Sequence, residues 1–219
     1  MAYHPIINFF VAEGVPAQTV YLLLMLPVIA TLVAFFRQIV GIKAFGIYTP
    51  SIITFAFLAF GEKGLKYGVA IFIAVIAVGM LSRYLLRYFR LLYLPRVAIT
   101  LSIVSIVILL ILAFGGSVQR TGLASVDIFP LLIMITLAEK FIGTQIEQGS
   151  RTALILAGET LVISIIGYYF VSQSFLVNFI LHYPWVILLT FLVNIALGKW
   201  TGLRLIELLR FRHILGHKN

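Results

Sequence analysis

The stretch QTVYLLLMLPVIATLVAFF, residues 18–36, is apolar along almost its whole length and contains no charged residue. A membrane-spanning helix needs roughly 20 mostly apolar residues to cross a hydrocarbon core about 30 Å thick. The rest of the chain is similar in character, because 62% of its 219 residues are hydrophobic and only 11% are charged. Soluble domains are about half apolar and a quarter charged. The composition therefore excludes a soluble globular class and predicts an all-α polytopic membrane protein.

Six further apolar runs give seven candidate transmembrane helices, at residues 47–60, 67–81, 97–114, 128–148, 152–171 and 177–197. Two runs are short on apolarity alone, and each carries a proline near its start, Pro50 or Pro130. On apolarity alone the second of these covers only residues 128–138. It reaches spanning length, at 128–148, if its polar residues form one stripe along a helix that faces other helices or water. Glu139 and Glu147 have helical spacing along that stripe.

The basic charge predicts an orientation. The chain has sixteen Lys and Arg against seven Asp and Glu, a formal charge of +9. With seven crossings and an external N-terminus, only Lys63, Lys66 and Arg120 lie outside and the other thirteen basic residues are cytoplasmic. Such an excess is typical of cytoplasmic loops. We therefore expect a bacterial inner-membrane protein with an external interfacial lead-in (1–17), a seven-helix domain (18–198) and a basic amphipathic cytoplasmic tail (199–219).

Two stretches resemble each other. Residues 41–50 and 122–130 each begin with a glycine and end at a proline that starts a short apolar run, and each is followed by a charged bend and a long apolar run. The predicted topology gives the two proline helices opposite directions. This pattern indicates a 3+3 inverted repeat with one extra helix, and short interrupted segments at matching positions point to a midplane site. The alternative is that Gly and Pro are simply common in membrane helices.

Glu159 is the most unusual residue, because a carboxylate near the middle of a span is costly and is by default a functional candidate. It could carry a proton or meet a cation or a basic substrate group, or it could be a hydrogen-bonded packing residue. Lys43 precedes the first proline helix, where a cation and free backbone amides could hold an anion. Its alternative is a plain cytoplasmic anchor. The predicted substrate path or midplane site joins both residues to Thr49, Pro50, Pro130, Glu139, Lys140 and Glu147. For the charged residues Glu139, Lys140 and Glu147, the alternative is a solvated helix end with an i,i+4 ion pair of Glu147 and Arg151.

A second set of basic residues predicts either headgroup contacts or a docking face for a cytoplasmic partner. Interleaved tyrosines accompany part of this set, and the tail has the spacing of an amphipathic surface helix. Its members are Arg83, Arg87, Arg90, Arg96, Arg204, Arg210 and Arg212.

No enzyme signature is present in the sequence. The absence of cysteine excludes thiol catalysis and Cys metal sites, and the four histidines have no metalloprotease spacing. No nucleophile elbow and no phosphate-binding loop occurs. We therefore expect no enzyme activity, no cofactor and no metal, although intramembrane carboxylate chemistry stays open.

Several stretches resemble the bacterial seven-transmembrane domain usually fused to an inactive transglutaminase-like domain. They are residues 46–57, the turn at 61–68, Leu94-Pro-Arg96, Phe129-Pro130 and residues 201–212. The proline helices are also similar to the small membrane subunit of poly-gamma-glutamate capsule synthesis. The first resemblance implies work beside an ATP-grasp ligase-like protein. The transglutaminase-like part would be a separate periplasmic protein or would be absent. It implies no catalytic residues.

The resemblance leads us to expect the membrane component of a system that synthesises, modifies or exports a glutamate-rich peptide or polymer. A scaffold that recruits a cytoplasmic ligase and a secondary transporter of a small solute remain the alternatives. Partners would include the bilayer and its anionic headgroups and exclude nucleic acid, and the chain could oligomerise. The sequence itself leaves the substrate and the direction of movement open.

Overall fold

The computed structural model describes residues 4–61, 64–86, 88–89, 91–117, 128–200 and 202, without the side chains of 115–117. This part of the chain is helical and contains no strand. The elements are α1 (Pro5–Ala12), α2 (Ala17–Phe35), η1 (Phe36–Val40), α3 (Tyr48–Ala59), α4 (Gly64–Leu86), α5 (Tyr93–Ser117), α7 (Ile128–Glu147), α8 (Ser150–Val171), α9 (Ser174–His182) and α10 (Val186–Gly198). The tail predicted at 199–219 lies almost entirely outside the described residues.

Five segments are long and apolar enough to cross a membrane: α2 with η1, α4, α5, α7 and α8. These agree with the predicted spans, including the run at 128–148, which forms the single helix α7. Helix α3 is apolar but has only 12 residues, about 18 Å at 1.5 Å per residue. It is therefore as short as the sequence indicated.

The run at 177–197 was predicted as one span, and the structure shows that it is not a straight helix. The chain forms two helices, α9 and α10, that are bent by 104° at a short break. Pro184 explains the break, because proline lacks the N–H of a helix interior and keeps the preceding residue away from helical torsions. Tyr183, which precedes it, has φ −127° and ψ 66°. The pair is either one broken span or a re-entrant loop, which gives at most six spans by length and composition.

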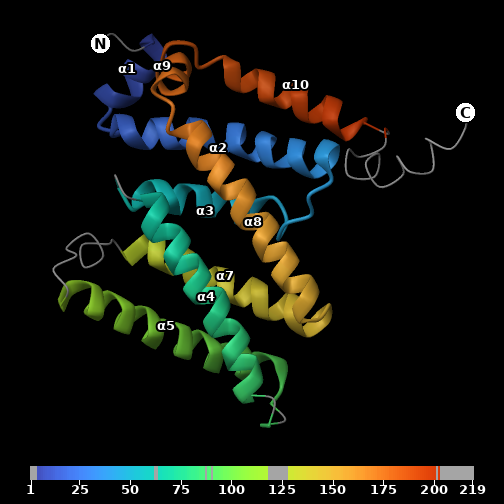
Figure 1. The fold of residues 1–219 in the computed structure, drawn as a ribbon. Coiled ribbons are helices and arrows are strands. Elements are labelled where there is room, and N and C mark those ends of the chain that lie inside the picture. The colour runs from blue at the N-terminus through green and yellow to red at the C-terminus, as the bar shows by residue number, and fades with distance from the viewer. Residues whose placement is uncertain are drawn as a thin grey trace, which may run out of the picture. The chain divides into compact units, whose positions relative to one another are not determined.

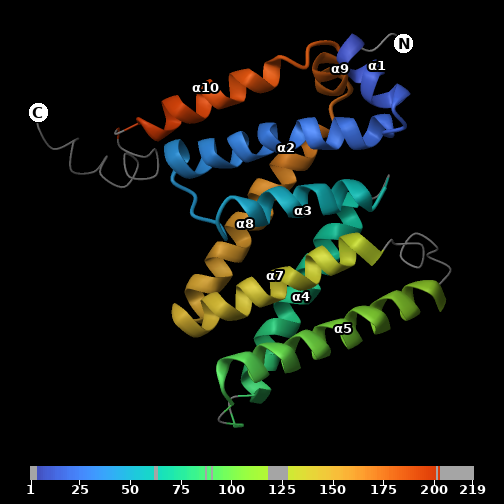
Figure 2. The same cartoon turned by 180° about the vertical axis from the view of Figure 1, so that it is seen from behind.

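The chain divides into two compact units, of which unit 1 comprises residues 1–43 and 169–219. Within its described part, helix α2 packs against α1, α9 and α10, and α10 runs alongside α2 in both views (Figures 1 and 2). Polar side chains tie these helices together. Asn194 Nδ2 donates to Thr31 Oγ1 at 2.7 Å, and Tyr21 Oη donates to the Val171 carbonyl at 2.8 Å.

Unit 2 comprises residues 44–168 and is one continuous segment. Helix α7 is its centre and packs against α3, α4 and α5 (Figure 2). Phe57 of α3 and Phe141 of α7 are completely buried. Gly68 of α4 lies against the Phe57 ring, and a β-carbon at Gly79 would lie 3.0 Å from Phe141. Small residues on α4 therefore allow its backbone to approach both aromatic rings, as is common between membrane helices.

Candidate functional site

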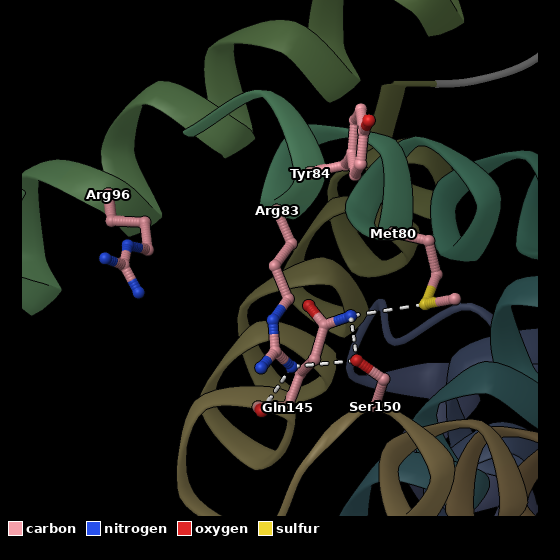
Figure 3. Close-up of a pocket in the computed structure, with 6 residues that line it drawn as sticks. All are labelled: Met80, Arg83, Tyr84, Arg96, Gln145 and Ser150. Carbon is pink, nitrogen blue, oxygen red and sulfur yellow. Dashed lines mark hydrogen bonds between the residues drawn. The ribbon is translucent and has the colours of Figure 1, made fainter. Parts of the chain in front are cut away.

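A polar cavity of about 470 Å³ opens where four helix ends of unit 2 come together. Helices α4 and α7 end here, and helices α5 and α8 begin here. We call it the Arg83–Arg96 pocket, and Figure 3 shows the side chains that line it. They are Met80, Arg83, Tyr84, Arg96, Gln145 and Ser150. Its volume lies within the usual range for small-molecule sites, roughly 300–1,000 Å³.

Arg83 is held from the α7 and α8 side of the pocket. Its Nη1 donates to the Gln145 carbonyl at 2.7 Å and to Ser150 Oγ at 2.9 Å. The last four carbonyls of a helix have no partner within the helix, and Gln145 belongs to the final turn of α7. Arg83 therefore caps the C-terminus of α7, which favours a cation, and this contact fixes its guanidinium at the pocket wall.

Arg96 stands across the opening from Arg83, in the first turn of α5 (Figure 3). Its Nη2 donates to the Leu91 carbonyl at 3.3 Å. Its Nε is buried and has no hydrogen-bond partner in the described part of the chain. A buried N–H of this kind normally has an acceptor, so Arg96 retains an unused donor.

Gln145 is the third polar group of the pocket, and only 1% of its surface is exposed. Its Nε2 lies 3.2 Å from Met80 Sδ and 3.4 Å from Ser150 Oγ. Its Oε1 is buried without a partner among the described residues, which typically costs about 1–3 kcal/mol. A second, water-sized space of about 10 Å³ is lined by Arg83, Arg96 and Gln145 together with Gly79, Thr100, Ile142 and Ile146.

The electrostatics of this pocket favour an anion. Among the residues that the structure places around it, two are arginines and none is acidic. Guanidinium groups bind carboxylate and phosphate through paired, charge-assisted hydrogen bonds. Partial burial strengthens these interactions, because the effective dielectric constant falls below that of water. The arrangement can hold a carboxylate or a phosphate group between α4 and α5.

Glu159 was a candidate for proton or substrate chemistry, and the structure gives its carboxylate a backbone partner. The Ala44 N–H donates to Glu159 Oε2 at 3.0 Å, and the Phe45 N–H donates to Thr160 Oγ1 at 3.0 Å. Residues 44–47, here the Ala44 turn, precede α3 and include positive φ angles at Ala44 (45°) and Gly46 (84°). Two neighbouring side chains of α8 thus hold this strained turn, which supports the packing alternative for Glu159.

The same face of α8 also holds the first turn of α3. Ser164 Oγ donates to the Pro50 carbonyl at 3.1 Å, and Thr54 Oγ1 donates to the same carbonyl at 2.9 Å. Thr54 also donates to the Ser164 carbonyl at 3.3 Å. Gly167 completes the contact, since a β-carbon there would lie 2.7 Å from Thr54 Oγ1. Pro50 is buried in this contact, so its position serves packing.

Three of the other predicted path residues meet in a groove of about 160 Å³ between α3 and α7. We call it the α3–α7 groove, and Thr49, Glu139 and Lys140 line it with Tyr48, Ile52, Ile53, Ile133 and Thr136. Neither Glu159 nor Pro130 belongs to that lining. The predicted path residues therefore do not gather around a single described cavity.

The remaining predictions have separate outcomes. Lys43 is exposed and belongs to unit 1. Glu147 is exposed at the end of α7, whereas Arg151 lies on α8 beyond the turn at Gly149, so the suggested i,i+4 pair on one helix is wrong. Of the predicted docking arginines, Arg83 and Arg96 face the pocket. The others, Arg87, Arg90, Arg204, Arg210 and Arg212, lie outside the described residues.

Gln145, Ser150 and Met80 are site residues that the sequence analysis missed. Gln145 continues the buried face of α7 that contains Leu137 and Phe141 at intervals of four. A lone amide on an apolar helical face was therefore an available signal. No group of three or more His, Cys, Asp or Glu that could hold a metal ion occurs within the described ranges.

The family comparison agrees with this architecture. A family described as seven transmembrane helices usually fused to an inactive transglutaminase matches residues 3–215. No significant match was found among curated proteins or among solved structures. The family match covers nearly the whole sequence, and the helices and spans described above are consistent with it. The chain belongs to this family of seven-transmembrane domains that are usually fused to an inactive transglutaminase.

Proposed function

We propose that this protein is the membrane component of a system that synthesises, modifies or exports a glutamate-rich peptide or polymer, and that the Arg83–Arg96 pocket binds carboxylates of that substrate. The observation that carries the proposal is the pair of arginines around a cavity whose lining contains no acidic residue. A glutamate-rich chain presents one carboxylate per residue, which is the ligand that guanidinium groups bind best in pairs.

The proposal includes seven crossings with the N-terminus outside the bacterial inner membrane. Helix α3 would be the second crossing, with the Ala44 turn extending it, and the bent pair of α9 and α10 would be the seventh. The positive-inside pattern then puts the pocket at the cytoplasmic face, where a newly made polymer would arrive. The inverted repeat is supported by one detail, because Pro50 and Pro130 are each the third residue of their helices.

We propose no catalytic step in this chain. We assign anion binding and helix packing to the described residues, and the family description names an inactive transglutaminase as its usual fusion partner. Bond formation would belong to an ATP-grasp ligase-like protein on the cytoplasmic side. A transglutaminase-like protein would act in the periplasm. The α3–α7 groove, which Thr49, Glu139 and Lys140 help to line, would form another part of the substrate route.

A scaffold role, in which the arginines contact a partner protein, is less well supported. Arg83 donates its hydrogen bonds inward, to Gln145 and Ser150, and both described arginines of the predicted docking set line a cavity. A docking surface would direct these groups outward.

The test is binding of triglutamate to the purified full-length protein in nanodiscs of zwitterionic lipid. We expect salt-sensitive binding that falls about tenfold or more in Arg96→Gln, since a lost charge-assisted hydrogen bond costs about 1.5–3 kcal/mol. Arg151→Gln is the matched control, because Arg151 is exposed in the first turn of α8, and we expect less than about a twofold change there. Absence of triglutamate binding, or equal binding by both variants and the unmodified protein, would contradict the proposal.

A partner experiment addresses the system rather than the pocket. Affinity purification from the native host should recover an ATP-grasp ligase-like protein, and Arg96→Gln should leave that association intact while lowering the amount of exported product. If Arg96→Gln instead releases the ligase and leaves triglutamate binding unchanged, the scaffold role replaces substrate binding.

A further inference from the structure

The Arg83–Arg96 pocket is not uniformly a donor site. Arg83 and Arg96 offer N–H donors, but the buried Oε1 of Gln145 is an acceptor without a partner among the described residues. Gln145 and Arg96 both line the small inner space of about 10 Å³. The two residues that carry the unused donor and the unused acceptor therefore line the same confined space as well as the larger pocket.

Arg96 Nε needs an acceptor and Gln145 Oε1 needs a donor. Because two guanidinium groups line the pocket, the favoured ligand carries an anionic acceptor with a hydrogen-bond donor close beside it. Sulfate or a phosphodiester supplies acceptors for the arginines and leaves Gln145 Oε1 without a donor. A free amino acid supplies a donor, but that donor is an ammonium group. Two guanidinium groups repel a third positive charge, and the repulsion grows as the site excludes water.

An acylated amino acid avoids this conflict. Its nitrogen is a neutral amide N–H, and its α-carboxylate is attached to the same α-carbon. We propose that the pocket recognises the end of a peptide chain, with the terminal carboxylate on Arg83 and Arg96 and the N–H of the same residue donating to Gln145 Oε1. This inference rests on the proposed function and deepens it, since it selects the acylated chain end over free glutamate.

The unpaired acceptor and the buried position of Gln145 make it a specificity-determining residue under this proposal. Its side chain is almost fully buried and is positioned through Met80 and Ser150. It cannot turn toward solvent to satisfy Oε1 without losing these contacts. A site built around a buried polar group discriminates against analogues that leave that group unpaired.

The test uses three probes on the full-length protein in nanodiscs of zwitterionic lipid, read by isothermal titration calorimetry. They are N-acetyl-glutamyl-glutamate, the same compound methylated on the nitrogen of its terminal residue, and free glutamate. We expect the acetylated dipeptide to bind about tenfold or more tightly than either of the other two, because each lacks a neutral N–H beside the terminal carboxylate.

The variant Gln145→Met keeps the volume and removes the acceptor. It should abolish the preference for the unmethylated dipeptide and leave the affinity for the methylated one unchanged. The control Gln148→Met alters an exposed glutamine just beyond the end of α7, and it should keep the full preference. Because the comparison is a ratio within one variant, a general loss of affinity does not imitate the effect.

The outcomes separate the two proposals. Equal binding of the methylated and unmethylated dipeptides, or a preference that persists in Gln145→Met, overturns the chain-end inference and leaves carboxylate binding in place. Failure of every glutamyl probe overturns the proposed function itself. The lipid alternative is tested in nanodiscs that contain anionic phosphatidylglycerol. If this lipid abolishes dipeptide binding by the unmodified protein but does not lower the residual dipeptide binding of Arg96→Gln, the pocket holds a lipid headgroup and the inference is wrong.

Discussion

The Ala44 turn and the Arg83–Arg96 pocket are two places in unit 2 where polar groups meet at the end of a helix. At the turn, the backbone donors of Ala44 and Phe45 each reach a side-chain oxygen of α8 at 3.0 Å. In the pocket, Arg96 Nε and Gln145 Oε1 are buried without partners in the described part of the chain. Buried polar groups that hydrogen-bond to one another stabilise a fold. Buried polar groups without a partner lower the folding free energy gained, and a bound ligand can satisfy them.

This difference between the two places assigns a structural role to the more unusual residue, Glu159, and a binding role to the more ordinary one, Gln145. Glu159 is unusual because it is an acid within a membrane span, yet its described hydrogen bond is with the backbone of a strained turn. Gln145 is not unusual in the sequence, yet its Oε1 is a buried acceptor without a hydrogen-bond partner among the described residues. Three stability measurements can break or sharpen this distinction, and they are ordered below by the size of the expected effect.

The largest effect is expected where α8 meets α3. In Gly167→Leu, the new side chain would overlap Thr54, which is fully buried and held by two hydrogen bonds. Overpacking of this kind costs about 1–3 kcal/mol and sometimes more, and we expect the upper end. The measurement is the free energy of unfolding in mixed detergent micelles. Gly158→Leu is the control on the same helix, since a β-carbon there meets nothing within 4 Å. An equal loss in both variants would remove the special role of this contact.

An intermediate effect is expected at Glu159. In Glu159→Ala, the Ala44 N–H loses its described partner, which should lower the free energy of unfolding by about 1–3 kcal/mol. Glu159→Gln keeps an acceptor oxygen and should lose less than about 1 kcal/mol. Thermal unfolding in detergent compares the two variants. A stable Glu159→Gln protein that no longer exports product would restore the reading of Glu159 as a path residue.

The smallest effect is expected at Gln145. Gln145→Met removes a buried unpaired oxygen, which costs about 1–3 kcal/mol, but it also removes the two hydrogen bonds that Nε2 donates. These changes oppose each other, so the stability should stay level or rise by up to about 1 kcal/mol. Gln148→Met should change stability by less than about 0.5 kcal/mol, as exposed substitutions usually do. A loss at Gln145 as large as that of Glu159→Ala would mean that both places are structural and would end the distinction.

Much of the fold could be predicted from the lengths of the apolar runs. A membrane span is recognisable from its own composition, and this signal does not depend on which helices pack against it. The spans at residues 18–36, 67–81 and 97–114 were located in this way. The break between α9 and α10 was missed although Pro184 was visible. A proline within a membrane helix is often tolerated, since neighbouring helices can satisfy the freed carbonyl groups. Pro27 within α2 illustrates that tolerance, so a proline alone does not decide between a kink and a break.

The site was predicted less completely, for a reason that lies in tertiary structure. Arg83 and Arg96 were selected for charge and expected to face headgroups or a partner protein. The inward direction of Arg83 depends on the Gln145 carbonyl of α7 and on Ser150, which are 62 and 67 residues away from it. No local pattern encodes such a contact. The unmet oxygen of Gln145 is a property of four helix ends packed together, and it does not exist at the level of sequence.

The order in which the units occupy the sequence has a consequence for biosynthesis. Unit 2 is a continuous segment, whereas unit 1 is assembled from the first 43 residues and the last part of the chain. Helix α2 ends at Phe35 and its neighbour α10 begins at Val186. The ribosome adds roughly 5–20 residues per second, so α10 is synthesised on the order of ten seconds after α2. During this interval Thr31 has no Asn194 to bind, so the nascent chain must hold an incomplete helix pair while the inserted unit is synthesised and packed.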